Sequence, residues 1–206
     1  MPKVVDEEKR RQRIAEAVWD IAAEQGLDRA TVRAVAARCG LSVGSVQHSF
    51  RSQGELKRFA MELVVQRVTE RLSVTPDSAV GPLDEQQAVA ALLLETLPLD
   101  DEREKEARIW AAFSASALVD KRLAPYGRQM SALLERFCLA CLEALGAAVA
   151  PSAKRELRLE ALHLHALLDG LTLDLLADPS PSRRQQAAQV VRSYVECIGS
   201  KEATCS

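Results

Sequence analysis

The sequence predicts an all-α protein, and three observations support this fold class. Ala, Leu, Glu, Arg and Gln, which are strong helix formers, dominate the 206 residues. Apolar residues recur every three or four positions over most of the chain, and no stretch shows the two-residue alternation of a half-buried strand. Gly and Pro stand between the periodic stretches, as is typical of helix ends. We therefore expect about nine helices.

The composition is that of an ordinary globular protein. Apolar residues make up 48% of the chain and charged residues 27%, which suffices for one or two compact domains. The sequence has no run of 18 or more apolar residues, so we expect no membrane span. The charged N-terminus lacks the apolar core of a secretion signal. The five Cys are irregularly spaced, and we expect reduced thiols in a cytoplasmic protein.

Charge is unevenly divided along the chain, although the formal net charge is only −2. Residues 1–58 contain 11 Lys and Arg against 8 Asp and Glu, whereas residues 59–206 contain 16 against 21. The N-terminal part is therefore net basic and the remainder net acidic. Because only the local field meets a bound polyanion, this division is compatible with a basic DNA-binding head on an acidic body.

The stretch from Thr31 to Phe50 has the pattern of a helix-turn-helix. Ala36 is small enough for two helices to cross, and Gly40 tolerates the positive φ that a tight turn requires. Thr31 and Ser42 stand where each helix favours a hydroxyl N-cap. The apolar residues that fit the inner faces are Val32, Val35, Leu41, Val46 and Phe50.

Polar side chains follow the predicted outer face of the second of these helices, residues 42–49. They are Ser45, Gln47, His48 and Ser49. In a DNA-binding helix-turn-helix the second helix lies in the major groove, where such side chains read base edges. The alternative is a pair of packed helices that does not contact DNA.

The remaining helices follow from periodicity, caps and breakers. We expect an irregular segment over residues 1–8, then helices over 9–25, 53–72, 84–97, 100–119, 120–145, 152–177 and from 181 to about 198, with a loop over 73–83. Ser52 and Glu55 have the spacing of a capping box, and Pro125 is expected to break or kink its helix. Lys9, Arg10, Arg11 and Arg13 open the first helix, either against a phosphate backbone or as a solvated helix start.

The predicted helix over residues 152–177 is apolar on two sides. One stripe consists of Leu157, Ala161, Leu164, Leu168, Leu171 and Leu175, and a second consists of Leu159, Leu162, Leu167, Leu173 and Leu176. So wide an apolar surface exceeds what one small monomer usually covers.

The sequence resembles the TetR/AcrR family of bacterial repressors. The resemblance is carried by the basic first helix, by Thr31–Ala36 (TVRAVA), by Cys39–Val46 (CGLSVGSV) and by Phe50 followed by a capped helix, and it covers roughly residues 10–60. The stretch His165–Leu171, followed by Pro179, is similar to the C-terminal domain of BetI-type members.

The resemblance implies a helix-turn-helix DNA-binding domain over residues 1–52 and a helical ligand-binding and dimerisation domain over residues 53–206. It implies a homodimer, in which the last two long helices pair with their copies in a four-helix bundle and two heads bind a palindromic operator. We assign that contact to Leu157, Leu164, Leu168, Leu171, Leu175, Val191, Tyr194 and Val195. It also implies an effector pocket among the middle helices, whose occupancy shifts the long fourth helix.

The candidate DNA contacts are Thr31, Arg33, Ser42, Val43, Ser45, Gln47, His48 and Arg51. The sequence departs from the family at Gln47 and Ser49, where the family often has an aromatic residue and His or Tyr. It also has Gln53 where a phosphate-binding Lys is usual, and Arg51 and Lys57 could compensate. An operator sequence therefore cannot be transferred, although the Gln47 amide suits bidentate bonding to adenine.

The candidate effector contacts are Met61, Leu93, Leu97, Trp110, Phe113, Ser114, Met130, Phe137 and His163. Together they suggest a mostly apolar cavity with a few polar groups. Met and aromatic residues at helical spacing are more often part of a filled core, and this alternative stays open.

Other chemistry is weakly supported by the sequence. Cys138 and Cys141 fall inside a predicted helix, where they suit a packed core better than a redox switch. His163 and His165 point to different helix faces, and His165 with Asp169 is a poor metal site, so we expect no metal and no cofactor. With three His, no G-x-S-x-G and no P-loop, an enzyme is not expected.

We interpret the chain as a dimeric, ligand-responsive transcriptional repressor that a small, mostly apolar effector releases from DNA. A small-molecule-binding protein that has lost DNA binding is the rival hypothesis, suggested by Gln53 and the weak net charge.

Overall fold

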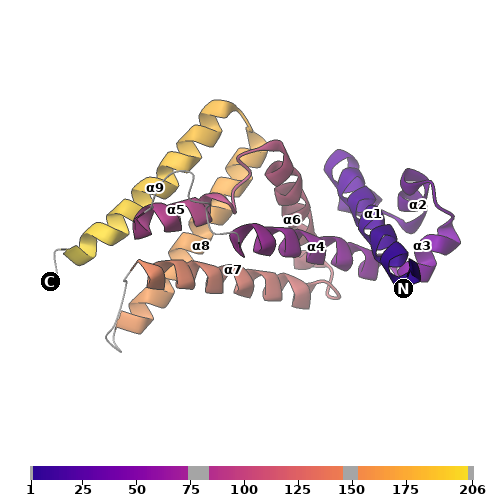
Figure 1. Ribbon diagram of the computed structural model, residues 1–206, viewed down its shortest axis with the longest axis horizontal. Coiled ribbons are helices and arrows are strands. Elements are labelled where there is room, and N and C mark those ends of the chain that lie inside the picture. The colour runs from indigo at the N-terminus through magenta and orange to yellow at the C-terminus, as the bar shows by residue number, and fades with distance from the viewer. Residues whose placement is uncertain (1, 74–83, 146–152, 204–206) are drawn as a thin grey trace. The chain divides into compact units, whose positions relative to one another are not determined.

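The computed structural model describes residues 2–73, 84–145 and 153–203 and confirms an all-α fold. Within these ranges the chain forms nine α-helices and one 3₁₀ helix, η1 (Figure 1). Their bounds are α1 Pro2–Gln25, η1 Leu27–Arg29, α2 Val32–Cys39, α3 Val43–Ser49, α4 Gln53–Ser73, α5 Glu85–Leu94, α6 Asp101–Val119, α7 Ala124–Ala144, α8 Ala153–Ala177 and α9 Pro181–Ala203.

The chain divides into two compact units. The first contains Met1–Thr69 and Lys105–Arg128, and the second contains Glu70–Glu104 and Gln129–Ser206. Helices α4, α6 and α7 each continue from one unit into the other. The boundary that we expect after residue 52 separates a DNA-binding domain from a ligand-binding and dimerisation domain. It concerns function and stays a prediction.

In the first unit, α1 packs against α2 and is tied to α4. Its apolar side, which includes Ile14, Val18 and Ile21, is fully buried, as the helical spacing predicts. The indole Nε1 of Trp19 donates a 2.9 Å hydrogen bond to the carbonyl of Ala60 in α4. This long-range bond and the buried stripe fix α1 on α4.

In the second unit, α9 packs against both α5 and α8. Figure 1 shows α5 alongside the yellow helix α9. Leu93, Leu164 and Val191, one from each of these three helices, are completely buried in the shared core. Burying such side chains stabilises this unit by about 1.5–3 kcal/mol each.

Helix α1 is longer than the sequence analysis predicts. The segment 1–8 was expected to be irregular, but α1 already begins at Pro2. Pro is well tolerated in the first turn of a helix. Glu7 also pairs with Arg10 one turn later, at 3.6 Å, which suits a helical conformation.

Of the break or kink expected at Pro125, the kink is absent, and the predicted helix over 120–145 is instead interrupted before α7 begins. Helix α7 begins at Ala124, so Pro125 occupies its first turn, where a missing N–H removes no helical hydrogen bond. The Asp120 carboxylate instead accepts a 2.9 Å bond from the Arg122 backbone N–H in the preceding turn.

Other ends differ by a few residues. Helix α5 ends at Leu94 rather than at residue 97, and α9 continues through Gly199. Ser52 accepts the Glu55 N–H as a capping box requires, but the Glu55 carboxylate accepts from Arg51 rather than from Ser52. The predicted loop over 73–83 lies outside the described residues, except for Ser73, which ends α4.

The turn between α2 and α3 depends on Gly40. Its φ of 64° and ψ of 30° are left-handed, and the following Leu41 N–H bonds to the Ala36 carbonyl at 2.9 Å. This is the left-handed helix ending that favours glycine, because an added Cβ would crowd the backbone.

We expect Gly40→Ala to lower the free energy of unfolding by about 1–2 kcal/mol, the cost of a left-handed L-residue. Gly54→Ala is the matched control, since Gly54 is helical and an added Cβ would make only an ordinary contact at 3.8 Å with Ser52 Oγ. The control should raise stability, by up to about 1 kcal/mol. Urea unfolding curves measure both changes, and equal effects of the two variants would contradict the assignment.

Candidate nucleic-acid interface

Both helices of the predicted helix-turn-helix have the caps that the sequence indicates. The Thr31 hydroxyl accepts a 3.2 Å bond from the Ala34 N–H, and the Ser42 hydroxyl accepts a 3.1 Å bond from the Ser45 N–H. These bonds satisfy backbone donors that the first turn of each helix would otherwise leave without a partner. The starts of α2 and α3 are therefore fixed locally.

The inner face of the motif is packed as predicted at its centre. Val35, Val46 and Phe50 are completely buried, and Ala36 is 1% exposed where the two helices meet. Because α3 has only seven residues, this burial rather than its own propensity holds it in place.

The outer face of α3 is exposed, with one exception to the prediction. Val43, Gln47 and His48 are exposed. Ser45 is half-buried, and the Ser42 hydroxyl donates a 3.0 Å bond to the Ser45 hydroxyl. Ser49 is buried instead of exposed, because it lies one turn after the buried Val46 and therefore on the inner face. The side chains available to a ligand are thus those of Val43, Gln47 and His48.

Arg11 packs into the first unit rather than facing outward. Its guanidinium lies 4.7 Å from the centre of the Phe50 ring and 4.5 Å from that of Phe59, and its Nη1 donates a 3.5 Å bond to the carbonyl of Ser49. It thereby holds the C-terminal end of α3. This role cannot be predicted from the sequence, because spacing does not reveal that Phe59 of α4 meets Phe50.

The rest of the basic cluster divides between partners and solvent. Arg10 is half-buried and pairs with Glu7, whereas Lys9 and Arg13 are exposed. Of the cluster, therefore, Lys9 and Arg13 are the residues that could meet a phosphate.

Thr31, Arg33 and Arg51 are also exposed, close in sequence to the caps of the motif. The side chains of Arg33 and Arg51 can therefore reach a ligand from the solvent side. Elsewhere, the Arg38 guanidinium makes two hydrogen bonds of 2.9 and 2.6 Å to the Glu24 carboxylate and lowers the pKa of that carboxyl.

The idea that Lys57 could replace the family's phosphate-binding Lys is wrong. Lys57 is 8% exposed, and its Nζ lies 3.0 Å from an Asp28 carboxylate oxygen. Gln53 also has an internal role, since its Nε2 donates a 3.4 Å bond to the carbonyl of Ala30. Both side chains fasten the start of α4 to the segment before α2.

The candidate effector contacts belong to both units. Met61, Trp110, Phe113 and Ser114 lie in the first unit, and Leu93, Leu97, Met130, Phe137 and His163 lie in the second. Met61, Phe113, Leu93 and Leu97 are buried, and Trp110, Ser114, Met130 and Phe137 are partly buried.

His163 does not face the interior, contrary to our expectation. Its side chain is 60% exposed, and its Nδ1 lies 3.5 Å from the Glu160 carboxylate one turn earlier. The sequence pattern does not predict that His163 is exposed, because α8 carries apolar residues on two sides.

Most residues assigned to the dimer contact are buried inside a single chain. Leu157, Leu164, Leu168, Leu175, Val191 and Val195 are each less than 9% exposed, Leu171 is partly buried, and Tyr194 donates a 2.6 Å bond to Glu160. These buried side chains hold α8 and α9 within one protomer, so a partner copy cannot contact them without repacking.

Three of the five residues in the second stripe of α8 are exposed, whereas Leu167 and Leu176 are partly buried. Leu159, Leu162 and Leu173 are 46–55% exposed, and Val190 of α9 is 42% exposed. The two stripes have the same helical spacing in the sequence, and the packing of α8 within its own unit decides which of them is buried.

The remaining reactive side chains are held in unreactive settings. Cys138 and Cys141 are buried, and burial raises the pKa of each thiol to about 12, which opposes thiolate formation. His165 Nε2 lies 3.4 Å from an Asp169 carboxylate oxygen. Within the described part of the chain, no group of three or more His, Cys, Asp and Glu side chains is placed to hold a metal ion.

None of the described helices is long and apolar enough to cross a lipid bilayer.

Comparisons with known proteins agree with the geometry. The chain is 36% identical over 198 residues to the HTH-type transcriptional regulator PksA of Bacillus subtilis strain 168, which covers 96% of this chain and 94% of PksA. It is 28% identical to the HTH-type transcriptional regulator BetI of Serratia proteamaculans strain 568, with 95% of each chain covered.

A solved structure shares the fold over nearly the whole chain. A transcriptional regulator from Rhodococcus sp. Rha1 superposes with a TM-score of 0.74 at 32% identity, covering 90% of this chain and 95% of its own. Residues 14–57 match the bacterial regulatory proteins of the tetR family, and residues 85–199 match the C-terminal domain of BetI-type transcriptional repressors. The chain therefore belongs to the TetR family of DNA-binding transcriptional regulators, with a BetI-type C-terminal domain, and is not an enzyme.

Proposed function

We propose that the protein is a homodimeric repressor that binds a palindromic operator and is released from it by a small, mostly apolar effector. The observation that carries this proposal is the division of α3 into a buried inner face and an exposed outer face. A seven-residue helix whose outer face offers Val43, Gln47 and His48 has the form of a recognition helix in the major groove.

The side chains of this face divide between base reading and phosphate binding. Gln47 can accept and donate one hydrogen bond each with the N6 and N7 edge of adenine, and Val43 can contact a thymine methyl. Arg33 and Arg51 are exposed cations that suit phosphates, which supply affinity without sequence choice. The basic excess of residues 1–58 favours the approach of DNA.

The exposed stripe of α8 supports a second copy of the chain as partner. Leu159, Leu162 and Leu173 of α8 and Val190 of α9 each expose an apolar side chain that water solvates poorly. A two-fold dimer places the same patch on both subunits, so each leucine contributes twice. Two heads in such a dimer would meet successive major grooves about 34–36 Å apart, or a multiple of that distance.

Release from DNA requires the effector to bind one conformation more tightly than another. A ligand with equal affinity for both conformations would shift nothing, however tightly it bound. Within the second unit, the buried Leu93 and Leu97 favour an apolar effector over a strongly charged one.

Gel-shift titration against the DNA upstream of the protein's own gene, at two salt concentrations, tests DNA binding. Specific binding that weakens with salt supports the proposal. Absence of binding at both salt concentrations would favour a small-molecule-binding protein without DNA binding.

We expect Gln47→Ala and Arg51→Ala to differ in kind. Loss of the Gln47 amide should remove discrimination at one base pair, by about 5–150-fold, because a good bidentate pair contributes about 1–3 kcal/mol. Loss of Arg51 should weaken specific and scrambled duplexes alike and reduce the salt slope by about 1. Titrations on both duplexes measure the difference, and identical profiles of the two variants would refute the division of roles.

We expect Leu162→Asp to weaken dimerisation by at least about tenfold, because a buried unpaired charge is costly in a central position of an interface. Leu118→Asp is the control, since Leu118 is 88% exposed at the end of α6, away from the exposed stripe of α8 in the sequence. Sedimentation analysis over a concentration series measures the dissociation constants. Dimers that tolerate Leu162→Asp as well as Leu118→Asp would exclude α8 as the contact.

A further inference from the structure

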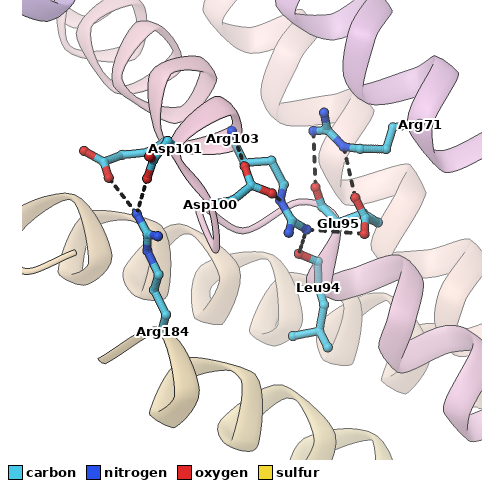
Figure 2. A network of polar contacts seen from close by, with 8 residues as sticks. Arg71, Leu94, Glu95, Asp100, Asp101, Arg103 and Arg184 are labelled. Carbon is cyan, nitrogen blue, oxygen red and sulfur yellow. Dashed lines mark hydrogen bonds and ion pairs between the residues drawn. The ribbon is translucent and has the colours of Figure 1, made fainter. Parts of the chain in front are cut away.

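Seven charged side chains of the second unit form two adjoining groups of ion pairs and hydrogen bonds (Figure 2). We name this set the arginine junction, and its members are Arg71, Glu95, Asp100, Asp101, Arg103, Glu104 and Arg184. They come from the last turns of α4, the end of α5, the start of α6 and the start of α9. The junction therefore joins four helices of the second unit.

Glu95 lies at the centre of the first group. One of its carboxylate oxygens is 3.1 Å from Arg71 Nε, and the other is 3.3 Å from Arg103 Nη1 (Figure 2). A single carboxylate is thus shared by an arginine of α4 and an arginine of α6. Such charge-assisted contacts are stronger and more directional than neutral hydrogen bonds.

The same two arginines bind the carbonyls at the end of α5. Arg103 Nη1 donates a 3.3 Å bond to the carbonyl of Leu94, and Arg71 Nη2 donates a 3.3 Å bond to that of Glu95. The last carbonyls of a helix lack helical partners and carry partial negative charge, so cations are favoured there. The end of α5 is therefore held from α4 and from α6 together.

The second group fixes the first turn of α6. Arg184 of α9 donates to Asp101 at 3.3 Å and to Glu104 at 3.0 Å. Asp100 accepts bonds of 2.8 Å from the backbone N and from Nε of Arg103. The start of α6 is therefore attached to α9 through Arg184 and to α5 through Arg103.

The junction residues stand next to the points where α4 and α6 leave the second unit. The second unit begins at Glu70 within α4, one residue before Arg71, and its segment ends at Glu104 within α6, one residue after Arg103. Both helices continue unbroken from the junction into the first unit, which contains the helix-turn-helix. A continuous helix transmits a displacement of one end to the other, because its backbone hydrogen bonds resist bending.

We propose that the arginine junction sets the separation of the two DNA-binding heads by fixing the directions of α4 and α6, with Glu95 as the positioning residue that both helices share. This inference rests on the proposed function, because the separation of two heads has meaning only in a DNA-bound dimer. The junction determines which operator spacing is accepted, whereas α3 determines which bases are read.

The test compares three variants with the wild-type protein on duplexes of graded half-site spacing. Half-sites are first obtained by selection from random duplexes with the wild-type protein. Glu95→Gln keeps the size of the side chain but removes the shared charge, and Arg184→Gln separates α9 from α6. Arg183→Gln is the matched control, because Arg183 is the adjacent residue and its ion pairs among the described residues are with Asp174 and Asp178, at 3.7 and 3.6 Å, outside the junction.

Two readouts are used, and the second does not depend on DNA binding. The first is the ratio of affinities for the best spacing and for spacings one base pair longer or shorter. The second is amide hydrogen exchange of residues 62–73 and 101–108, measured without DNA. Thermal unfolding verifies that each variant is folded.

We expect Glu95→Gln and Arg184→Gln to lower spacing selectivity by about fivefold or more, as is typical of a coupling between sites, while the preference for the selected half-site over a scrambled one is unchanged. Exchange of the helix ends next to each substitution should be faster than in Arg183→Gln. Spacing profiles that match the wild type in all variants would overturn the proposal. If the wild-type protein bound no duplex, the proposed function would fail, and unchanged exchange in Glu95→Gln would separately refute the junction.

Discussion

The site depends on the burial of one side of α3. A seven-residue helix is too short to be stable alone in water, so Val46, Ser49 and Phe50 must hold it against the first unit. Phe50 lies 5.2 Å from the Phe59 ring of α4, and the Arg11 guanidinium lies against both rings. The hydrophobic core beneath α3 therefore sets the orientation of its outer face. A substitution in that core would alter DNA binding although the substituted side chain does not contact DNA.

Local patterns predicted much of the fold and of the site. The caps at Thr31 and Ser42 and the left-handed turn at Gly40 are all present. They were predictable because each joins residues no more than five positions apart, so that the sequence itself contains both partners. The same reasoning identified the buried centre of the helix-turn-helix and the exposed Gln47.

Partners distant in the sequence could not be predicted in this way. The sequence suggests Arg11 as a DNA contact, but in the structure its guanidinium lies against Phe59 of α4. It suggests Lys57 likewise, but the Lys57 Nζ lies 3.0 Å from a carboxylate oxygen of Asp28 in η1. The two leucine stripes of α8 are equivalent in spacing, and only packing against the neighbouring helices buries most of the first and leaves Leu159, Leu162 and Leu173 of the second exposed. The carboxylate of Glu95 likewise pairs with Arg71 and Arg103, which are 24 and 8 positions away, and no sequence pattern predicts these pairs.

The central claim is that the outer face of α3 enters the major groove, and chemical protection of bound DNA tests it most directly. Dimethyl sulfate modifies guanine N7 in the major groove and adenine N3 in the minor groove. The account predicts protection of guanine N7 in two patches whose centres are about 10–10.5 base pairs apart, or a multiple of that spacing. Saturating binding that leaves every guanine N7 reactive, or that protects adenine N3 alone, would contradict it.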